Sequence, residues 1–330
     1  MAKSNKFRRN KRTGLIVALL AVIICGFCVL CSVQEKHGYD FGLPTFSLSS
    51  PIGWLESFFG SFGDGGALPV SGQARDTLEV HQIDVGQADC VLIIGPEKTV
   101  LIDAGENGQG DQVVRYLKKQ GITCIDILIG THPHSDHIGG MDAVIRSLDV
   151  GEVLLPPIPD YIFPTTRAFT DFLTAIDDKG LGVTTALPGD SYNLGGGATL
   201  SILGPLREYA DLNNQSVIAR VVYGNTSFLF TGDALKDAER DLLEKAHTLR
   251  SDVLSLAHHG SNTSTNKDFL QAVSPSIALI SCGMDNNYGH PHREVIERLR
   301  ETGARILRTD QNGTIVLISD GESIGVEVER

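Results

Sequence analysis

The stretch THPHSDHIGG, residues 131–140, places three of the chain's ten histidines and one aspartate within six positions. Alternate residues of an extended loop face the same way, so His132 and His134 are expected to reach one ion together. Asp136 and His137 follow directly and point toward a neighbouring position. Imidazole and carboxylate groups bind zinc, and they bind manganese or iron when oxygen ligands dominate. The stretch therefore predicts a metal site, with room for two ions bridged by a carboxylate.

The apolar pattern of the surrounding chain predicts an α/β fold with mixed sheets. Residues 125–130 (IDILIG) form a continuous apolar strand that leads into the histidine stretch, and residues 78–85 (LEVHQIDV) alternate like a half-buried strand. Some strands are joined by short turns and others alternate with helices, which favours mixed sheets covered by helices over strict β-α-β alternation. The other predicted strands are 90–95, 99–105, 152–156, 198–204, 216–224, 226–233, 252–260, 276–283, 304–310, 313–320 and 323–329. The predicted helices are 111–120, 141–149, 166–180, 235–247, 267–273 and 293–303.

Further polar side chains stand where predicted strands end. Strands of one sheet that end on the same side bring such groups together, so these side chains are expected to converge on the histidine stretch. Two of them, Asp84 and Asp103, are either metal ligands or acceptors that orient metal-bound histidines or cap loops. The complete set is Asp84, Asp103, Asp233, His258, His259 and His290.

The order of these motifs resembles the metallo-β-lactamase superfamily. HPHSDH resembles its signature loop, TGD at 231–233 its bridging-aspartate motif, and HHGS at 258–261 its last histidine motif. The similarity extends to the extracytoplasmic hydrolase domain of the competence protein ComEC through IDVGQAD, LIDAG, NNQSVIARVVYGNTSFLFTGD, NNYGHPH and LRTDQNGTI, and it spans residues 78–320. It implies an αββα sandwich of two mixed sheets. ComEC carries many membrane helices and this sequence has one candidate, so a stand-alone, singly anchored relative is expected and a DNA channel is not assumed.

The resemblance also implies a set of metal ligands. His132 and His134 would hold one ion, and Asp136 and His137 would serve a second. Asp233 would bridge the two ions. The implied cofactors are two divalent metal ions, zinc or manganese.

The last histidine motif leaves a choice between His258 and His259. We favour His259 as the final ligand, because the superfamily's ligand commonly precedes the small residue of this motif, and His258 would then line the substrate site. His290 either donates to developing charge or an anionic substrate, or structures a Gly-His-Pro turn. Asp136 is expected to orient the attacking water or take its proton. The predicted catalytic residues are therefore Asp136, His258 and His290.

The segment before the bridging aspartate departs from the superfamily pattern. Many members place another metal histidine there, whereas residues 211–219 (DLNNQSVIA) contain none. Asn213, Asn214 and Ser216 occupy this region instead. The first metal position is therefore expected to be open or completed by water, which makes manganese credible beside zinc.

The amino-terminal part of the chain predicts a membrane anchor. Residues 1–13 form a basic head with six Lys or Arg and no acidic residue, and residues 14–33 carry no charge over a length that crosses a bilayer. The positive-inside rule keeps the head in the cytoplasm. Residues 34–76 are a flexible linker rich in Gly, Ser and Pro, and residues 77–330 are the hydrolase domain. The predicted protein is single-pass in the cell membrane, with an extracytoplasmic hydrolase domain.

The ligand set favours a metal-dependent hydrolase, and the resemblance to ComEC implies a phosphodiesterase or nuclease with extracellular DNA as leading substrate. Charge weighs against DNA, because the chain after residue 13 holds 22 basic and 40 acidic residues, a net charge of −18. It also lacks a basic stripe with interleaved aromatic residues, so a smaller phosphoester fits equally well. One alternative is hydrolysis of another ester, a lactone or a β-lactam. The other is a non-catalytic metal-binding module or sensor, which metal content would distinguish. Protein partners cannot be read from the sequence.

Overall fold

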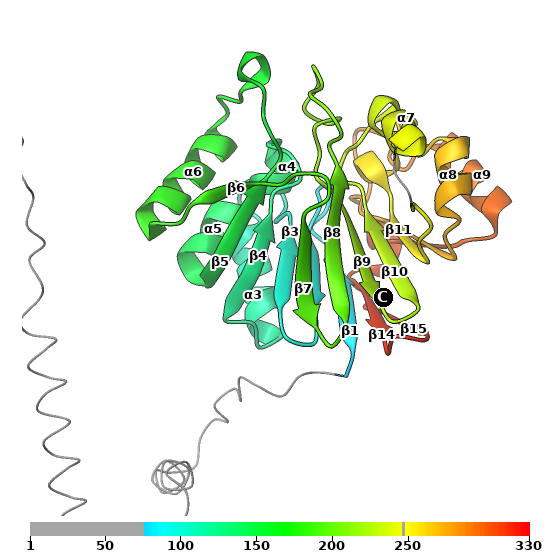
Figure 1. Ribbon diagram of the computed structural model, residues 1–330, viewed down its shortest axis with the longest axis horizontal. Helices are drawn as coiled ribbons and strands as arrows, with labels where there is room; N and C mark the ends of the chain where they lie inside the picture. Colours follow the sequence, from blue (N-terminus) through cyan, green and yellow to red (C-terminus); the bar gives the residue numbers. More distant parts are fainter. Residues whose placement is uncertain (1–75, 246–247) are drawn as a thin grey trace, which may run out of the picture. The chain divides into compact units, whose positions relative to one another are not determined.

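The computed structural model describes residues 76–245 and 248–330, and its strands form two mixed sheets (Figure 1). The order of the eight-stranded sheet is β15-β14-β1-β2-β3-β4-β5-β6, and that of the seven-stranded sheet is β13-β12-β11-β10-β9-β8-β7. The strands are β1 (Leu78–Gln82), β2 (Val91–Ile94), β3 (Thr99–Ile102), β4 (Cys124–Ile129), β5 (Asp149–Leu155), β6 (Val183–Thr185), β7 (Ser191–Gly195), β8 (Ala198–Gly204), β9 (Ile218–Tyr223), β10 (Thr226–Phe230), β11 (Val253–Ser255), β12 (Ile277–Ile280), β13 (Arg305–Arg308), β14 (Ile315–Ser319) and β15 (Ile324–Val328). The predicted arrangement of two mixed sheets with helices is confirmed.

Both faces of the central strands are buried, which explains their nearly continuous apolar sequences. Successive side chains point to opposite faces of a strand. In β2, Val91 and Ile93 pack into the core between the sheets, whereas Leu92 and Ile94 pack beneath the outer helices. The central core also contains Phe228 of β10, so the two sheets pack face to face.

Helices cover the outer face of each sheet. On the first sheet, Leu117, Val144 and Phe172 join one outer core, and on the second, Leu242 and Phe269 join another. The α-helices are α3 (Gly110–Lys119), α4 (Ser135–Ile138), α5 (Met141–Ser147), α6 (Arg167–Lys179), α7 (Lys236–Lys245), α8 (Lys267–Val273), α9 (Arg293–Thr302) and α10 (Thr309–Asn312), and the 3-10 turns are η1 (Asp160–Ile162) and η2 (Ala257–Gly260).

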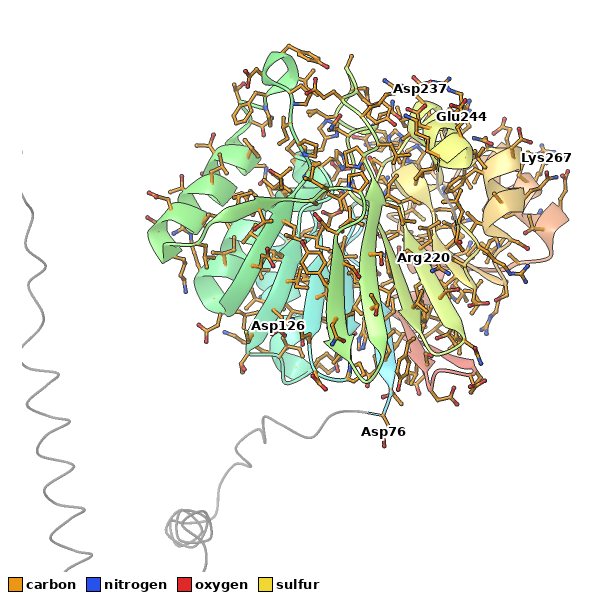
Figure 2. The ribbon with its side chains drawn as sticks, in the orientation of Figure 1. Asp76, Asp126, Arg220, Asp237, Glu244 and Lys267 are labelled. Carbon is orange, nitrogen blue, oxygen red and sulfur yellow. The ribbon has the colours of Figure 1, made fainter. Side chains whose placement is uncertain are left out.

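The outer helices show why the described domain tolerates so many acidic residues. Asp237 and Glu244 on α7 and Lys267 on α8 project from the molecule in Figure 2 and are exposed. Asp126 in β4 is used structurally, because its Oδ2 accepts a hydrogen bond of 2.8 Å from the backbone N–H of Thr99. Most charge therefore lies outside the packed layers.

Parallel pairing brings the functional segments to one edge. Strands β3 to β6 run parallel in the first sheet, and β10 to β13 run parallel in the second. Helix α4, which contains the Asp136–His137 pair, lies at the upper edge in Figure 1, beyond the carboxyl end of β4. Ligands of α/β sheets commonly bind beyond the carboxyl ends of the strands.

The sequence analysis missed two strands, and several predicted strands are shorter than expected, most of all the one at 252–260. Strands β6 and β7 are the terminal strands of their sheets, and their mainly exposed side chains lack the apolar alternation of a core strand. The strand predicted at 252–260 ends at Ser255, because the backbone of His258 and His259 turns to φ values of 53° and 54°.

The predicted head, anchor and most of the linker, residues 1–75, lie outside the residues that the structure describes. Within residues 76–245 and 248–330, no helix has both the length and the apolar character needed to cross a membrane.

Candidate metal centre

The histidine stretch is held by hydrogen bonds from two neighbouring backbone segments. The N–H of Asp89 donates to the carbonyl of Asp136 at 3.1 Å, and the N–H of Ala104 donates to the carbonyl of His137 at 2.7 Å. Both donors belong to segments that follow strands of the first sheet. The position of α4 is therefore set by the sheet and does not depend on the short helix alone.

Two glycines allow this close approach. A Cβ at Gly139 would lie 2.3 Å from the backbone nitrogen of Asn107, and one at Gly140 would lie 2.2 Å from the carbonyl oxygen of Ala104. Real side chains do not tolerate such distances, so only glycine fits here.

Asp233 stands at the centre of the cluster and faces four histidines. Its Oδ2 lies 3.7 Å from Nε2 of His132 and 3.8 Å from Nε2 of His258. Its Oδ1 lies 3.3 Å from Nε2 of His137 and 3.9 Å from Nε2 of His259. Each oxygen of this buried carboxylate therefore serves a different pair of imidazoles.

The structure brings the six sequence-predicted ligands together in two groups that share Asp233. Within each group the candidate ligand atoms lie within 4.8 Å of one another. The first group is His132, His134 and Asp233, and the second is Asp136, His137, Asp233 and His259. This is the division that the resemblance implied, with His259 and not His258 in the second group.

Hydrogen bonds from outside fix the orientation of His137. Its Nδ1 lies 2.7 Å from Oδ2 of Asp103, which also accepts a hydrogen bond of 2.7 Å from the Thr131 hydroxyl. Nδ1 therefore carries the proton, and the lone pair of Nε2 points at Asp233. Of the alternatives considered for Asp103, the structure favours an acceptor that orients a histidine.

His259 is oriented in the same way by the backbone. Its Nδ1 lies 3.1 Å from the carbonyl oxygen of Ser281, which can only accept, so the proton is on Nδ1. Its Nε2 then faces Oδ2 of Asp136 at 3.2 Å.

This arrangement places hydrogen-bond acceptors against acceptors unless a cation lies between them. Nε2 of His137 and Oδ1 of Asp233 are buried and have no hydrogen-bond partner. Buried polar atoms are rarely left unpaired, and a divalent ion would satisfy both. The residues present therefore fit a metal at this position.

The pKa shifts also indicate that the cluster favours a bound positive charge. Burial lowers the pKa of His137, but the carboxylates of Asp233 and Asp103 outweigh burial and raise that pKa well above its usual range. Burial opposes ionisation of Asp233, yet His137 and His259 hold its pKa well below its usual range. The pKa of His259 is raised to about 9, because the nearby carboxylates outweigh its burial. The cluster thus attracts a cation, whether a proton or a metal.

His258 lies at the open side of the cluster. Its side chain is 25% exposed, and its Nδ1 lies 2.9 Å from the hydroxyl of Thr263. Its ring centroid is 5.7 Å from that of His290. This position suits the predicted contact with substrate.

His290 is held by a side chain that the sequence analysis overlooked. Gln87 accepts a hydrogen bond of 3.0 Å from the N–H of Gly283 through Oε1, so its amide nitrogen faces Nδ1 of His290 at 3.2 Å. Nδ1 of His290 must accept this bond, which leaves the proton on Nε2. Burial, assisted by repulsion from His259 and His258, lowers the pKa of His290 to about 4. The ring is a neutral donor through Nε2.

Asp89 is a second residue that the sequence analysis missed. It is buried, and its Oδ1 lies 3.7 Å from Nδ1 of His259. Burial raises its pKa to about 6. Both Gln87 and Asp89 lie in the motif IDVGQAD, where Asp84 had drawn attention because it ends the predicted strand.

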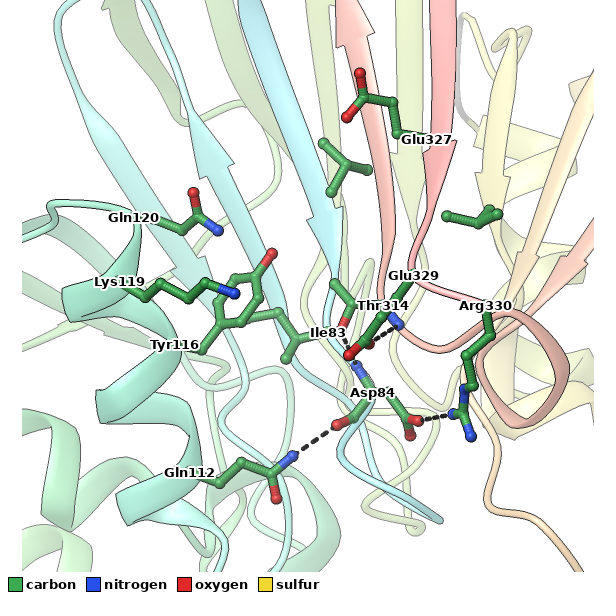
Figure 3. A pocket seen from close by; sticks show the side chains of 12 residues that line it. Ile83, Asp84, Gln112, Tyr116, Lys119, Gln120, Thr314, Glu327, Glu329 and Arg330 are labelled. Carbon is green, nitrogen blue, oxygen red and sulfur yellow. Dashed lines mark hydrogen bonds and ion pairs between the residues drawn. The ribbon is translucent and has the colours of Figure 1, made fainter.

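Asp84 does not take part in the cluster, so the ligand role and the histidine-orienting role considered for it are wrong, and its contacts are those of a loop cap. Its Oδ1 accepts a hydrogen bond of 3.1 Å from the N–H of Gly86, and its Oδ2 pairs with Arg330. Figure 3 shows it beside Thr314 at a separate cavity of about 600 Å³. Among the described residues, Asp84 belongs to none of the candidate metal groups.

The segment that lacks a histidine supports the centre in other ways. The hydroxyl of Ser216 accepts a hydrogen bond of 3.1 Å from the N–H of Asp233. Oδ1 of Asn214 accepts from the N–H groups of Leu235 and Ala238 at 3.1 and 3.2 Å, and so caps the start of α7. These residues help to position Asp233 and the helix that follows it.

Comparison with known proteins decides the family. Residues 83–284 match the family described as the Metallo-beta-lactamase superfamily. The chain belongs to this superfamily. Together with the donor set, membership identifies the described domain as a metal-dependent hydrolase of metallo-β-lactamase type.

The resemblance to ComEC-type hydrolase domains is confirmed by curated relatives. The chain is 32% identical over 256 residues to ComE operon protein 3 of Bacillus subtilis, covering 72% of this chain and 32% of the relative. It is 32% identical over 234 residues to Competence protein ComA of Neisseria gonorrhoeae, covering 70% and 31%. The chain spans about a third of the length of these relatives.

The fold is shared with solved structures at low sequence identity. A CmlA beta-hydroxylase E377D mutant aligns with a TM-score of 0.50 at 15% identity, covering 87% of this chain and 61% of the other. This likeness concerns the fold alone.

Proposed function

We propose that the chain is a phosphodiesterase or nuclease that uses metal-activated water, with extracellular DNA as its leading substrate. The observation that supports this most is the position of Asp233, which offers one oxygen to each histidine group. Two divalent ions about 4 Å apart stabilise both the attacking and the leaving oxygen of a displacement at phosphorus. The relation to competence proteins supports DNA over other esters, lactones and β-lactams.

The residues around these ions would have different roles in the reaction. Zinc or manganese ions held by the two groups would supply a water of lowered pKa and positive charge beside the phosphoryl oxygens. The Asp136 side chain is 30% exposed whereas that of Asp233 is 3% exposed, so Asp136 is the carboxylate that incoming water reaches. We assign Asp136 to orient the attacking water and accept its proton.

His290 and His258 would act on the substrate side. The Nε2–H of His290 is free to donate to a phosphoryl oxygen, since Gln87 occupies Nδ1. Such a fixed, neutral donor stabilises charge that develops in the transition state. His258 would line the path of the substrate.

The test measures metal content and turnover of the purified full chain. We expect two ions per chain and hydrolysis of bis-p-nitrophenyl phosphate and DNA with added Mn²⁺ or Zn²⁺. Asp136→Ala and His134→Ala should abolish turnover, because each removes a ligand or the proton acceptor, while circular dichroism stays that of the wild type. Unchanged turnover in either variant would contradict the assignment. A chain that binds no metal and stays inert would favour the non-catalytic alternative.

We also propose that residues 14–33 anchor the chain in the cell membrane with the hydrolase domain outside. The basic head and the uncharged run of 20 residues support this. Protease added to intact cells should remove the hydrolase domain from the membrane fraction, and full protection would contradict this topology.

A further inference from the structure

The loop after β12 presents an exposed tyrosine on a rigid frame. Oδ1 of Asn286 accepts hydrogen bonds from the N–H groups of Tyr288 and His290, at 3.2 and 2.9 Å. Its Nδ2 donates to the carbonyl oxygens of Gly283 and His290, at 2.9 and 2.6 Å. Gln87 ties the same loop to the first sheet through Gly283 and His290. The loop is therefore fixed before any ligand arrives.

The aromatic rings on this loop form a stack that leads outward from the metal centre. The His259 and His290 ring centroids are 6.2 Å apart with an interplanar angle of 29°, and the His290 and Tyr288 centroids are 5.6 Å apart with an angle of 22°. These are offset-stacked geometries. Exposure rises along the stack, from 2% at His259 and 9% at His290 to 69% at Tyr288.

The outer face of Tyr288 is thus available to another ring. Its side chain makes no hydrogen bond or ion pair with the described residues, and its ring contact is with His290. A single exposed tyrosine is ordinary on a protein surface. This one differs because it is stacked on His290, which is itself stacked on His259 of the metal group.

Charge indicates what kind of contact would hold a nucleic acid here. The nearest cation along the chain, Arg293, is paired with Glu297 at 2.7 Å, and it lies on the exposed surface of α9. Arg and Lys contacts to phosphates usually supply most nucleic-acid affinity. An acidic domain must obtain affinity for nucleic acid from other contacts. Stacking of bases on aromatic side chains is one such contact, because it does not depend on basic residues.

We propose that Tyr288, backed by His290, is a stacking platform for a nucleobase of the substrate, beside the phosphodiester at the metal centre. This inference rests on the proposed function and extends it, since it makes the substrate a nucleotide-containing, single-stranded chain and Tyr288 a determinant of specificity. Stacking of a base on Tyr288 costs less conformational entropy than stacking on a mobile side chain, because Tyr288 is already ordered.

The test is the binding of fluorescently labelled oligothymidylate to the full chain, measured by anisotropy in Ca²⁺ and again in EDTA. An abasic oligonucleotide of the same length provides the same phosphates without bases. Tyr288→Ala should weaken binding of oligothymidylate about tenfold or more. Tyr288→Trp should retain that binding, and the abasic strand should bind all variants equally weakly. Met284→Ala, which removes another exposed side chain of the same loop, should leave base-dependent binding intact.

The outcomes separate this inference from the proposed function. Equal binding of oligothymidylate and abasic strand by the wild type, or no loss in Tyr288→Ala, overturns the platform even if bis-p-nitrophenyl phosphate is hydrolysed. Base-dependent binding that Tyr288→Ala removes supports the platform even if no phosphodiester is hydrolysed, and only the proposed function then fails.

Discussion

At the scale of single residues, the centre depends on hydrogen bonds that fix histidine tautomers. Asp103 holds the proton on Nδ1 of His137, and the Ser281 carbonyl does so for His259. Both Nε2 atoms are thereby directed at carboxylates, where a proton or a metal ion can lie between the two groups. Partners of this kind orient ligands and raise their basicity.

Asp103→Asn should weaken metal binding by about 10- to 100-fold. The amide would either donate to Nδ1 of His137, which moves the proton to Nε2, or accept from Nδ1 without the negative charge that raises the basicity of the ring. Titration calorimetry of the full chain with Zn²⁺ or Mn²⁺ measures this loss. Asp84→Asn is the matched control, since Asp84 also ends a strand of the same sheet but pairs with Arg330. Equal affinities for the two variants would contradict the role of Asp103.

The sequence alone could not separate Asp84 from Asp103. Both are aspartates at the ends of predicted strands of one sheet, and both fit a ligand, an orienting acceptor or a loop cap. Their side chains differ in which neighbours the sheet brings to them, which is Thr131 and His137 for Asp103 and Arg330 for Asp84. Those neighbours are distant in sequence, so no local pattern encodes them.

At the scale of elements, the short helix α4 is held by contacts with a loop more than 25 residues earlier in the chain. Gly140→Ala would place a Cβ 2.2 Å from the carbonyl oxygen of Ala104. The loop must move, so we expect lower stability and weaker metal binding together. Gly182→Ala, where a Cβ meets nothing within 4 Å, is the control. Thermal unfolding and metal titration test this, and a Gly140→Ala protein with wild-type values in both would refute it.

A buried glutamate on α7 holds the start of α8. Glu239 is 1% exposed and accepts hydrogen bonds from the backbone N–H groups of Thr265 and Asn266 and from the side chain of Asn266. Glu239→Ala leaves these donors buried and unpaired, which should lower the free energy of unfolding by about 1–3 kcal/mol.

Urea denaturation measures the effect of Glu239→Ala. Glu244→Ala on the exposed face of the same helix should change the free energy of unfolding by less than about 0.5 kcal/mol. Similar losses in both variants would show that helix composition, and not this capping contact, is responsible.

At the scale of the whole molecule, the two sheets carry the halves of the centre. The histidine stretch follows β4 of the first sheet, whereas Asp233 and His259 follow β10 and β11 of the second. Metal ions bound between these segments should therefore link the sheets.

Removal of metal should destabilise the domain. An ion that binds only the folded state stabilises it by about 2.7 kcal/mol at a free concentration of 100 times its dissociation constant. We expect EDTA to lower the melting temperature of the full chain, and added Zn²⁺ or Mn²⁺ to restore it. The combined His134→Ala and Asp136→Ala variant should show little response to EDTA, and a wild-type protein that ignores EDTA would refute the metal linkage.

The sequence by itself predicted mixed sheets covered by helices, and its resemblance to the superfamily implied two such sheets and a set of candidate site residues. Apolar periodicity revealed the buried strands, because packing between two layers forces hydrophobic side chains onto both faces. The spacing within HPHSDH indicated four candidate metal ligands, because six consecutive residues hold three histidines and an aspartate.

Only the tertiary structure decided which residues support those ligands. Gln87 contacts His290 from a position 203 residues away in the chain, and Ser281 contacts His259 from 22 residues away. Asp89 lies beside His259, and Ser216, just before β9, holds Asp233. The sequence analysis missed the edge strands β6 and β7, because a strand at an exposed edge needs no apolar pattern. A contact between distant segments depends on how the layers pack, and packing is a property of the whole fold rather than of any short stretch.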